Sequence, residues 1–194
     1  MSKSVDSAAS ELTITSAVAK AAEMEVPGAH HVLQLLGSFE ERGPNGTHLV
    51  LVYPAMGGTV ASMVENLPQN REARKRRTRV PLRYPKWMAK RILKHTLLGL
   101  VFLHGQGIVH GDLQSGNLLF STRPLDGLNE VDLTQDMVAT TMPLTRRDGR
   151  TDLWAPRYLV LGQQLYEFAH LEEDINTKIS DLGAGKPSSN MARN

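Results

Sequence analysis

One run of the 194-residue chain, residues 108–120, constrains its fold and chemistry more than any other part. The run reads IVHGDLQSGNLLF and places Asp112 and Asn117 five residues apart, before a short apolar strand. Ahead of it, residues 87–104 carry apolar side chains at helical spacing, which predicts a buried helix. Behind it, residues 177–183 predict a second strand that ends in Asp181. A His-Gly-Asp turn alone can be an ordinary loop in which Asp112 caps the turn. This order of helix, loop and two strands instead indicates phosphoryl-transfer chemistry.

These motifs resemble those of the eukaryotic protein kinases, whose catalytic loop reads His-Arg-Asp-Leu-Lys-x-x-Asn and whose magnesium loop reads Asp-Phe-Gly. Within that family the sequence is most similar to the SR-protein-kinase-like branch, especially its divergent fungal members. The segments that carry the resemblance are HVLQLLGSF, the turn GPNGTH at Gly43 to His48, HGDLQ, WAPRYLVLGQQLYEF and KISDLGAG. It covers about residues 10–185, and it is specific at the two loops.

The resemblance implies a role for each matching polar residue. Asp112 is expected to accept or orient the proton of a substrate hydroxyl, and Asn117 and Asp181 to hold Mg²⁺. His110 is expected to pack beneath Leu182 and so to brace the two loops. Gln114 stands where the family has a lysine that neutralises the γ-phosphate, and a neutral amide cannot offset that charge.

The same resemblance implies an ATP site. Leu119 is expected under the adenine ring, and Tyr53 at the gatekeeper position before the hinge. The backbone of Pro54 and Met56 is expected to bind the adenine edge, where the missing N–H of proline is not needed. Glu11 matches the helix glutamate that pairs with a strand lysine, although a solvated glutamate fits that position equally well.

The departures from the family pattern are as informative as the matches. No Gly-rich loop or strand lysine precedes Glu11, and neither an activation loop nor an Ala-Pro-Glu anchor follows Gly183. Gly111 replaces the catalytic-loop arginine, so activation through a phosphorylated loop is not expected. The resemblance therefore supports ATP binding better than catalysis.

We expect an α+β fold that is a partial protein-kinase-like domain, running from the end of the N-lobe through the hinge to the Asp-Leu-Gly motif. The expected domain covers residues 1–185 and is truncated at both ends relative to a complete kinase. Its expected parts are an N-lobe remnant and hinge at 9–56, a C-lobe start at 57–185, a basic insert at 70–83, a long insert at 121–176, and a disordered tail at 186–194.

Local patterns predict the individual elements. We expect helices over 9–23, 60–66 and 86–104, and the basic insert as a loop. We expect strands over 32–39, 49–53, 108–109, 118–120 and 178–180, with a turn at 43–46. The aromatic and aliphatic residues of 154–168 are expected to pack on the lobe as one apolar cluster.

Composition narrows the possible partners and compartment. The chain has no cysteine, which excludes disulfides and thiolate zinc sites, and its histidines lack a metal-ligand spacing. It shows neither a signal peptide nor an apolar stretch long enough for a membrane, so we expect an intracellular protein, cytoplasmic or nuclear. The basic insert suggests a nuclear localisation signal, a phosphate-binding patch or a solvated loop. Nucleic-acid binding is unlikely because no aromatic residues interleave with the arginines.

Three functional hypotheses follow. The first is a serine/threonine protein kinase whose complete form transfers the γ-phosphate of MgATP to protein substrates, with Ser-Arg-rich proteins as one possibility. The second is a pseudokinase-like binding module, favoured by Gly111, Gln114 and the absent lysine. The third is a small-molecule phosphotransferase of the aminoglycoside or choline kinase type, which the FLHGQGIV lead-in at 102–109 disfavours.

Overall fold

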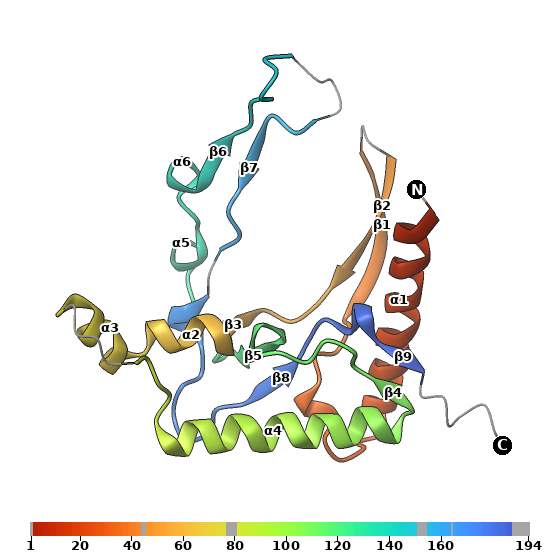
Figure 1. Cartoon of the computed structure of the whole chain (residues 1–194), viewed down its shortest axis with the longest axis vertical. Helices are drawn as coiled ribbons and strands as arrows, with labels where there is room; N and C mark the ends of the chain where they lie inside the picture. The colour runs from red at the N-terminus through yellow and green to blue at the C-terminus, as the bar shows by residue number, and fades with distance from the viewer. Residues whose placement is uncertain (1, 44–45, 77–80, 151–154, 164, 188–194) are drawn as a thin grey trace.

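The computed structural model describes residues 2–43, 46–76, 81–150, 155–163 and 165–187, and it describes no side chains for 2–10 and 72–74. A three-stranded antiparallel sheet of order β3-β5-β8 forms the centre. Its strands are β3 (Met56–Thr59), β5 (Leu118–Ser121) and β8 (Thr177–Ile179). Helix α4 (Lys86–Gly105) packs against β8 and runs along the base of the molecule in Figure 1.

The core lies between this sheet and helix α4. Burial alternates along β5, where Leu118 and Phe120 face inward while Leu119 is only half-buried, as expected for a strand with one covered face. Helix α1 (Ser2–Glu23) closes another side of the core with Ile14 and Val18. The largest fully buried side chains include Met63, Leu67, Phe102, Leu103, Phe120, Ile175 and Ile179.

The predicted helix over 86–104 is confirmed, but the prediction that it is buried is wrong for one of its faces. Met88, Ile92 and Leu103 are buried, whereas Leu93, Leu97 and Val101 are 63%, 63% and 68% exposed. The apolar residues of this segment go nearly all the way round the helix, and the sheet covers only part of that circumference.

In the amino-terminal part of the chain, the observed elements are of the predicted types, but some of their boundaries differ from the prediction. Helix α1 covers the predicted 9–23 and begins earlier, at Ser2. The 3-10 turn η1 (Ala29–His31) follows it. The strand predicted over 32–39 is wrong for residues 33–36. Val32 forms only an isolated bridge to Ile179, and strand β1 (Gly37–Gly43) starts five residues later.

Strands β1 and β2 (Gly46–Val52) form an antiparallel hairpin, in which Gly37 pairs with Val52 and Gly43 with Gly46. The hairpin confirms the predicted pairing, although the tip of its turn lies outside the described residues. It extends away from the central sheet (Figure 1), and most of its residues are exposed. Strand β3, which the sequence did not predict, follows it.

Helix α2 (Val60–Asn66) is confirmed, and the Thr59 side chain caps it by accepting from the Ser62 N–H at 3.0 Å. The basic insert was predicted as a loop, and this is wrong for its first residues, which lie in helix α3 (Pro68–Lys75). Pro68 suits the first helical position, and arginine, lysine, alanine and glutamate are strong helix formers. The Asn70 side chain connects the two ends of the insert, because it donates to the carbonyls of Val64 and Arg83 at 2.6 and 3.0 Å.

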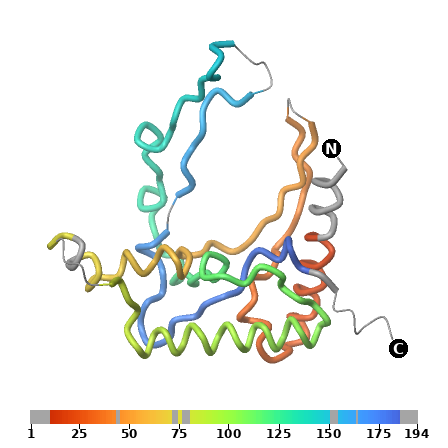
Figure 2. Tube along the Cα trace, viewed as in Figure 1, coloured from red at the N-terminus to blue at the C-terminus, as the bar shows by residue number. Residues whose placement is uncertain are grey.

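The described parts of the long insert form an arm that leaves the body and returns to it (Figure 2). It contains α5 (Glu130–Leu133), α6 (Met137–Thr140) and a hairpin of β6 (Thr141–Pro143) with β7 (Tyr158–Val160). The predicted apolar cluster is wrong for residues 158–161, which are 42–55% exposed. Trp154 lies outside the described residues. Only the end of the segment, at η3 (Tyr166–Phe168), packs partly against the core.

Short elements complete the chain. β4 (Ile108–Val109) pairs with β9 (Lys186–Pro187), so these two residues of the expected tail are ordered into a strand pair, and 188–194 lie outside the described residues. The 3-10 turns η2 (Ser115–Asn117) and η4 (Leu182–Ala184) flank the ends of β5 and β8. Within the described ranges, none of the helices combines the length and apolarity needed to cross a bilayer.

Candidate phosphoryl-transfer site

The loop between β4 and β5 is fixed by His110, which is 2% exposed. Its Nε2–H donates to the carbonyl of Ser180 at 2.9 Å, and its Nδ1 accepts from the backbone N–H of Asp112 at 3.3 Å. One imidazole therefore holds the loop that carries Asp112 against the end of β8. This hydrogen bond to Ser180 joins the two loops, while the packing of His110 beneath Leu182 stays a prediction.

Asp112, Gln114 and Asn117 form one hydrogen-bonded group on this loop. Asn117 Nδ2 donates to the carbonyl of Asp112 at 2.9 Å and lies 3.4 Å from Asp112 Oδ2. Gln114 Nε2 donates to the same Oδ2 at 3.0 Å. Since the Asn117 amide nitrogen faces Asp112, its Oδ1 points elsewhere and is available as an oxygen ligand.

Gly111 has a backbone reason to be glycine. Its φ is +85°, in the region that residues with a side chain rarely adopt. A Cβ at this position would lie 2.5 Å from the carbonyl oxygen of Ala184. The loop thus approaches the backbone of η4 more closely than any side-chain-bearing residue permits, including the arginine found there in the family.

Strand pairing brings the two expected metal ligands to the same end of the sheet. Leu118 pairs with Ile179, and the Ser180 N–H and hydroxyl both donate to the Asn117 carbonyl, at 2.8 and 3.0 Å. Asp181 follows immediately, with a left-handed backbone at φ 60°. Asn117 and Asp181 therefore flank one cross-strand link, although 64 positions separate them in the sequence.

Glu11 and Tyr53 lie near Asp181. An ideal Cβ on Gly183 would lie 3.3 Å from both Glu11 Oε2 and Asp181 Oδ1, which places the two carboxylates near each other. Burial and then the charge of Asp181 raise the pKa of Glu11. Burial, then the charge of Glu11, raises the pKa of the Tyr53 phenol, and a hydrogen bond between Tyr53 and Thr15 acts in the opposite direction.

This group is an uncompensated acidic pair, because no ion pair joins Glu11 or Asp181 to a lysine or arginine in the part of the chain that the structure describes. Two nearby carboxylates without a cation repel each other. A bound cation or a basic side chain would relieve this repulsion.

The expected adenine-binding residues come from two parts of the chain, because Tyr53, Pro54 and Met56 follow β2 whereas Leu119 lies in β5. Met56 pairs with Ser121, and Leu119 pairs with Thr59 on one side and with Lys178 on the other. Tyr53, Pro54, Met56 and Leu119 are all half-buried. The structure links Met56 to Leu119 through the β3-β5 pairing and links Tyr53 to Glu11, while Pro54 lies in the connection between them.

The donor set suits magnesium better than a fully protein-bound metal. Mg²⁺ keeps several waters and is usually held by one or two carboxylates together with phosphate oxygens. The Asp181 carboxylate and the free Asn117 amide oxygen meet that requirement. Among the described residues, no group of three or more histidine, aspartate or glutamate side chains could form a metal site without such help.

Motif analysis missed two contributions to this region. Gly57 and Gly58 in β3 leave room for the end of the long insert, since a Cβ on them would lie 2.5 Å from the Ala169 Cβ and 2.6 Å from the Tyr166 ring. The two adjacent glycines were the feature of the sequence that could have indicated this close contact. Lys178 is the cross-strand neighbour of Leu119, and burial lowers its pKa. No motif assigned it a role.

Comparison with known proteins gives relatives but no matching family model. The chain is 29% identical over 140 residues to Serine/threonine-protein kinase SKY1 of Saccharomyces cerevisiae, which covers 66% of this chain. It is 30% identical over 93 residues to Protein kinase dsk1 of Schizosaccharomyces pombe, covering 47% of this chain. It is 32% identical over 117 residues to Serine/threonine-protein kinase SRPK of Physarum polycephalum, covering 59%.

The matched segments make up 17%, 15% and 24% of those three relatives, so the chain spans less than a quarter of their length. All three are named as protein kinases, and two as serine/threonine kinases. The resemblance to the SR-protein-kinase-like branch is confirmed, and the mixed helix and sheet of the structure agrees with a partial kinase-like α+β fold.

Proposed function

We propose that this chain, a divergent relative of the SR-protein-kinase-like serine/threonine kinases, binds MgATP at the end of the β5-β8 pair. The observation that carries the proposal is the hydrogen-bonded link from Ser180 to Asn117, which brings Asn117 beside Asp181 while the Asn117 amide holds Asp112. A metal-binding pair and a hydroxyl-orienting carboxylate then share one small region.

In this proposal the Asp181 carboxylate and Asn117 Oδ1 hold the magnesium ion. Bound there with ATP, the ion would neutralise the negative charge of the phosphate groups. Leu119, Met56 and the backbone near Pro54 bind the adenine, with Tyr53 at the inner end of the site. Glu11 adds negative charge beside Asp181, which strengthens the attraction for a divalent cation.

The lobe boundaries belong to the same proposal. Residues 9–56 would form the end of an amino-terminal lobe with the hinge, and residues 57–185 would begin the carboxy-terminal lobe. In a complete protein, Asp112 would orient a serine or threonine hydroxyl toward the γ-phosphate. Ser-Arg-rich proteins are the substrate class that the names of the relatives suggest.

The direct test is the melting temperature of the purified chain with Mg²⁺ and ATP, each alone and together. Binding at about 100 times Kd stabilises a folded protein by about 2.7 kcal/mol, so MgATP should raise the melting temperature by several degrees. Asp181→Asn should abolish that rise. Asp126→Asn, at an exposed aspartate outside the site, should keep it. A cooperative melt that MgATP does not shift, or a rise that Asp181→Asn retains, would rule the proposal out.

A second candidate function is nucleotide binding without efficient transfer. It is favoured by Gln114, whose amide donates to Asp112 Oδ2 at 3.0 Å where the family has a cation. We expect no detectable transfer of phosphate from MgATP to a Ser-Arg peptide by the 194-residue chain. Transfer that disappears in Asp112→Ala would contradict this expectation. Transfer to an amino sugar or choline instead of peptide would favour a small-molecule phosphotransferase.

A further inference from the structure

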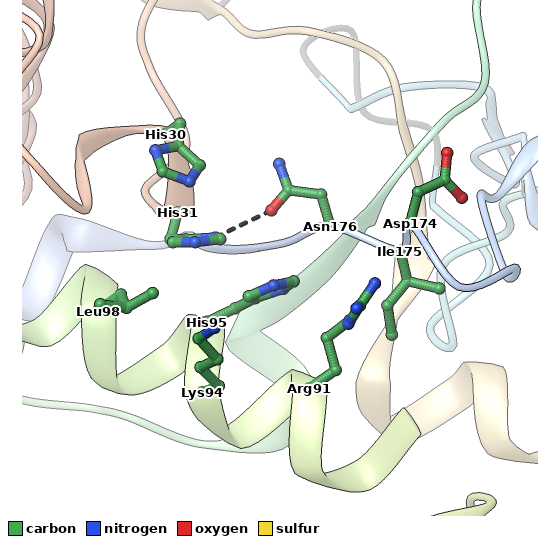
Figure 3. Close-up of a pocket in the computed structure, with 9 residues that line it drawn as sticks. All are labelled: His30, His31, Arg91, Lys94, His95, Leu98, Asp174, Ile175 and Asn176. Atoms are coloured by element: carbon green, nitrogen blue, oxygen red, sulfur yellow. Dashed lines mark hydrogen bonds between the residues drawn. The ribbon is translucent and has the colours of Figure 1, made fainter. Parts of the chain in front are cut away.

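A positively charged hollow lies at the opposite end of β8 from Asp181. Figure 3 shows it between the first half of α4 and the segment 174–176 that leads into β8. Its volume is about 400 Å³, and Arg91, Lys94 and His95 of α4 face His31 and Asn176 across it. The candidate phosphoryl-transfer site uses none of these residues.

Arg91 and Lys94 supply the positive charge of the hollow. Arg91 and Lys94 are three residues apart, so they lie on one face of the helix. Within the described ranges, neither forms an ion pair. Asp174 is the carboxylate on the rim, and it binds His170 at 2.8 Å. The hollow therefore offers a guanidinium and an ammonium group to an anion from outside.

Three histidines make the wall of the hollow rigid. His31 stacks on His95 with centroids 4.1 Å apart and planes at 19°, and His30 lies 3.9 Å from His31. His31 Nδ1 lies 2.9 Å from Asn176 Oδ1, and His95 Nδ1 accepts from the Thr177 N–H at 3.3 Å. Because both Nδ1 atoms are engaged, the ring orientations of His31 and His95 are fixed.

The electrostatic environment agrees with this geometry. Burial, and after it the proximity of His31 and Arg91, lowers the pKa of His95 to about 4. Burial, then His30, lowers the pKa of His31. Arg91 and Lys94 are among the charges that act on His95, and their positive potential attracts an anion.

A second hollow of about 480 Å³ continues from the first along α4. The two share Arg91 and Lys94, and the second adds Trp87, Lys90 and Glu173. Trp87 is 45% exposed, so its ring offers an apolar surface beside the cations. The combined surface is longer than a free phosphate ion needs, and it suits an extended chain that carries one doubly charged group.

We propose that these joined hollows bind a phosphorylated peptide segment, with the phosphate between Arg91 and Lys94 and the flanking residues along Trp87. A planar guanidinium makes paired hydrogen bonds to phosphate oxygens, and the lysine adds a second positive charge. The site is separate from the proposed nucleotide site, so either can be present without the other.

The test is fluorescence anisotropy of a labelled 12-residue peptide that carries one phosphoserine among neutral residues, titrated with the full chain. The unphosphorylated peptide, inorganic phosphate and MgATP serve as competitors. We expect only the phosphopeptide to bind well, with Arg91→Gln/Lys94→Gln weakening it at least tenfold. Arg83→Gln/Lys86→Gln removes the same two charges from exposed positions outside both hollows, and this variant should bind like the wild type.

Three results would overturn the proposal. The first is equal binding of the unphosphorylated peptide. The second is equal loss of affinity in both double variants, which would indicate attraction by net charge alone. The third is full competition by inorganic phosphate or MgATP at the affinity of the phosphopeptide, which would indicate a simple anion or nucleotide site. Because Lys94 is exposed and Arg91 half-buried at the rim, circular dichroism melting should show the variants folded.

Discussion

Gly111 shows how a single residue decides the geometry of the candidate site. We expect Gly111→Ala to destabilise the chain, because φ is +85° and the new Cβ would lie 2.5 Å from the Ala184 carbonyl oxygen. Holding a non-glycine residue in such a backbone costs about 1–3 kcal/mol, and relieving the close contact adds to that. Urea denaturation of the variant and the wild type measures the difference in the free energy of unfolding.

Gly127→Ala is the matched control. Gly127 has no atom within 4 Å of an ideal Cβ, so this substitution should change the free energy of unfolding by less than about 0.5 kcal/mol. Equal effects of the two substitutions would contradict the close approach of the catalytic loop to η4.

Glu11 gives a second residue-scale prediction, through pH. Its pKa in the folded chain is raised above the ordinary 4.5 by burial and by Asp181, so the folded state binds this proton more tightly than the unfolded state. Stability from this group is then lost as pH rises above about 4.5. We expect Glu11→Gln to be more stable than the wild type near pH 7, and the difference to shrink toward pH 4.

Denaturant titrations from pH 4 to pH 8 would test this sign. Glu23→Gln, an exposed position on the same helix, controls for the loss of one negative charge. A difference that grows toward acid pH would show that Glu11 is stabilised as a carboxylate, and it would contradict the uncompensated pair.

Short motifs in the sequence made Asp112, Asn117 and Asp181 candidates for the site, and their roles stay predictions. It did not show that Glu11 lies beside Asp181, since their closeness depends on how α1 packs against η4. Nor did it show why Gly111 is glycine, because the cause is a carbonyl contributed by a segment 73 positions later.

At the scale of elements, α4 separates what periodicity predicts from what it cannot. The helix itself was predictable from apolar spacing over 86–104. Which of its faces is covered was not, because apolar residues occupy several faces and the sheet contacts only part of them. Leu103 is 0% exposed, and Leu97 is 63% exposed.

These two leucines therefore predict unequal effects. Leu103→Ala should lower the free energy of unfolding by about 2–5 kcal/mol, as expected for a cavity in a core. Leu97→Ala should change it by less than about 0.5 kcal/mol. Thermal or urea unfolding would measure both. A large loss in Leu97→Ala would show that this face is covered in solution.

Helix α3 and the arm illustrate the other limits of local patterns. Charge made the insert at 70–83 look like a loop, yet the helix propensity of its residues prevailed in α3. The aromatic and aliphatic residues of 154–168 suggested a packed cluster, yet the β6-β7 hairpin carries Tyr158, Leu159 and Val160 away from the core (Figure 1). Apolar composition alone does not determine which side chains are covered.

At the scale of the whole molecule, the chain is a central sheet with α4 beneath it, α1 at one side and two hairpins that extend outward (Figure 1). Local patterns predicted helices α1, α2 and α4 and strands β2, β4, β5 and β8, but not α3, β3 or the elements of the arm. The pairing of β5 with β8 across the long insert is what assembles the candidate site, and local patterns gave the two strands without their pairing.

Calorimetric titration of MgATP into the wild-type chain tests the central claim most directly. The account predicts saturable binding at one site, which weakens at least tenfold in Asp181→Asn or when EDTA removes Mg²⁺, and which persists in Asp126→Asn. Absence of saturable binding to a chain that melts cooperatively would contradict the account, and so would equal affinity in the wild type and Asp181→Asn.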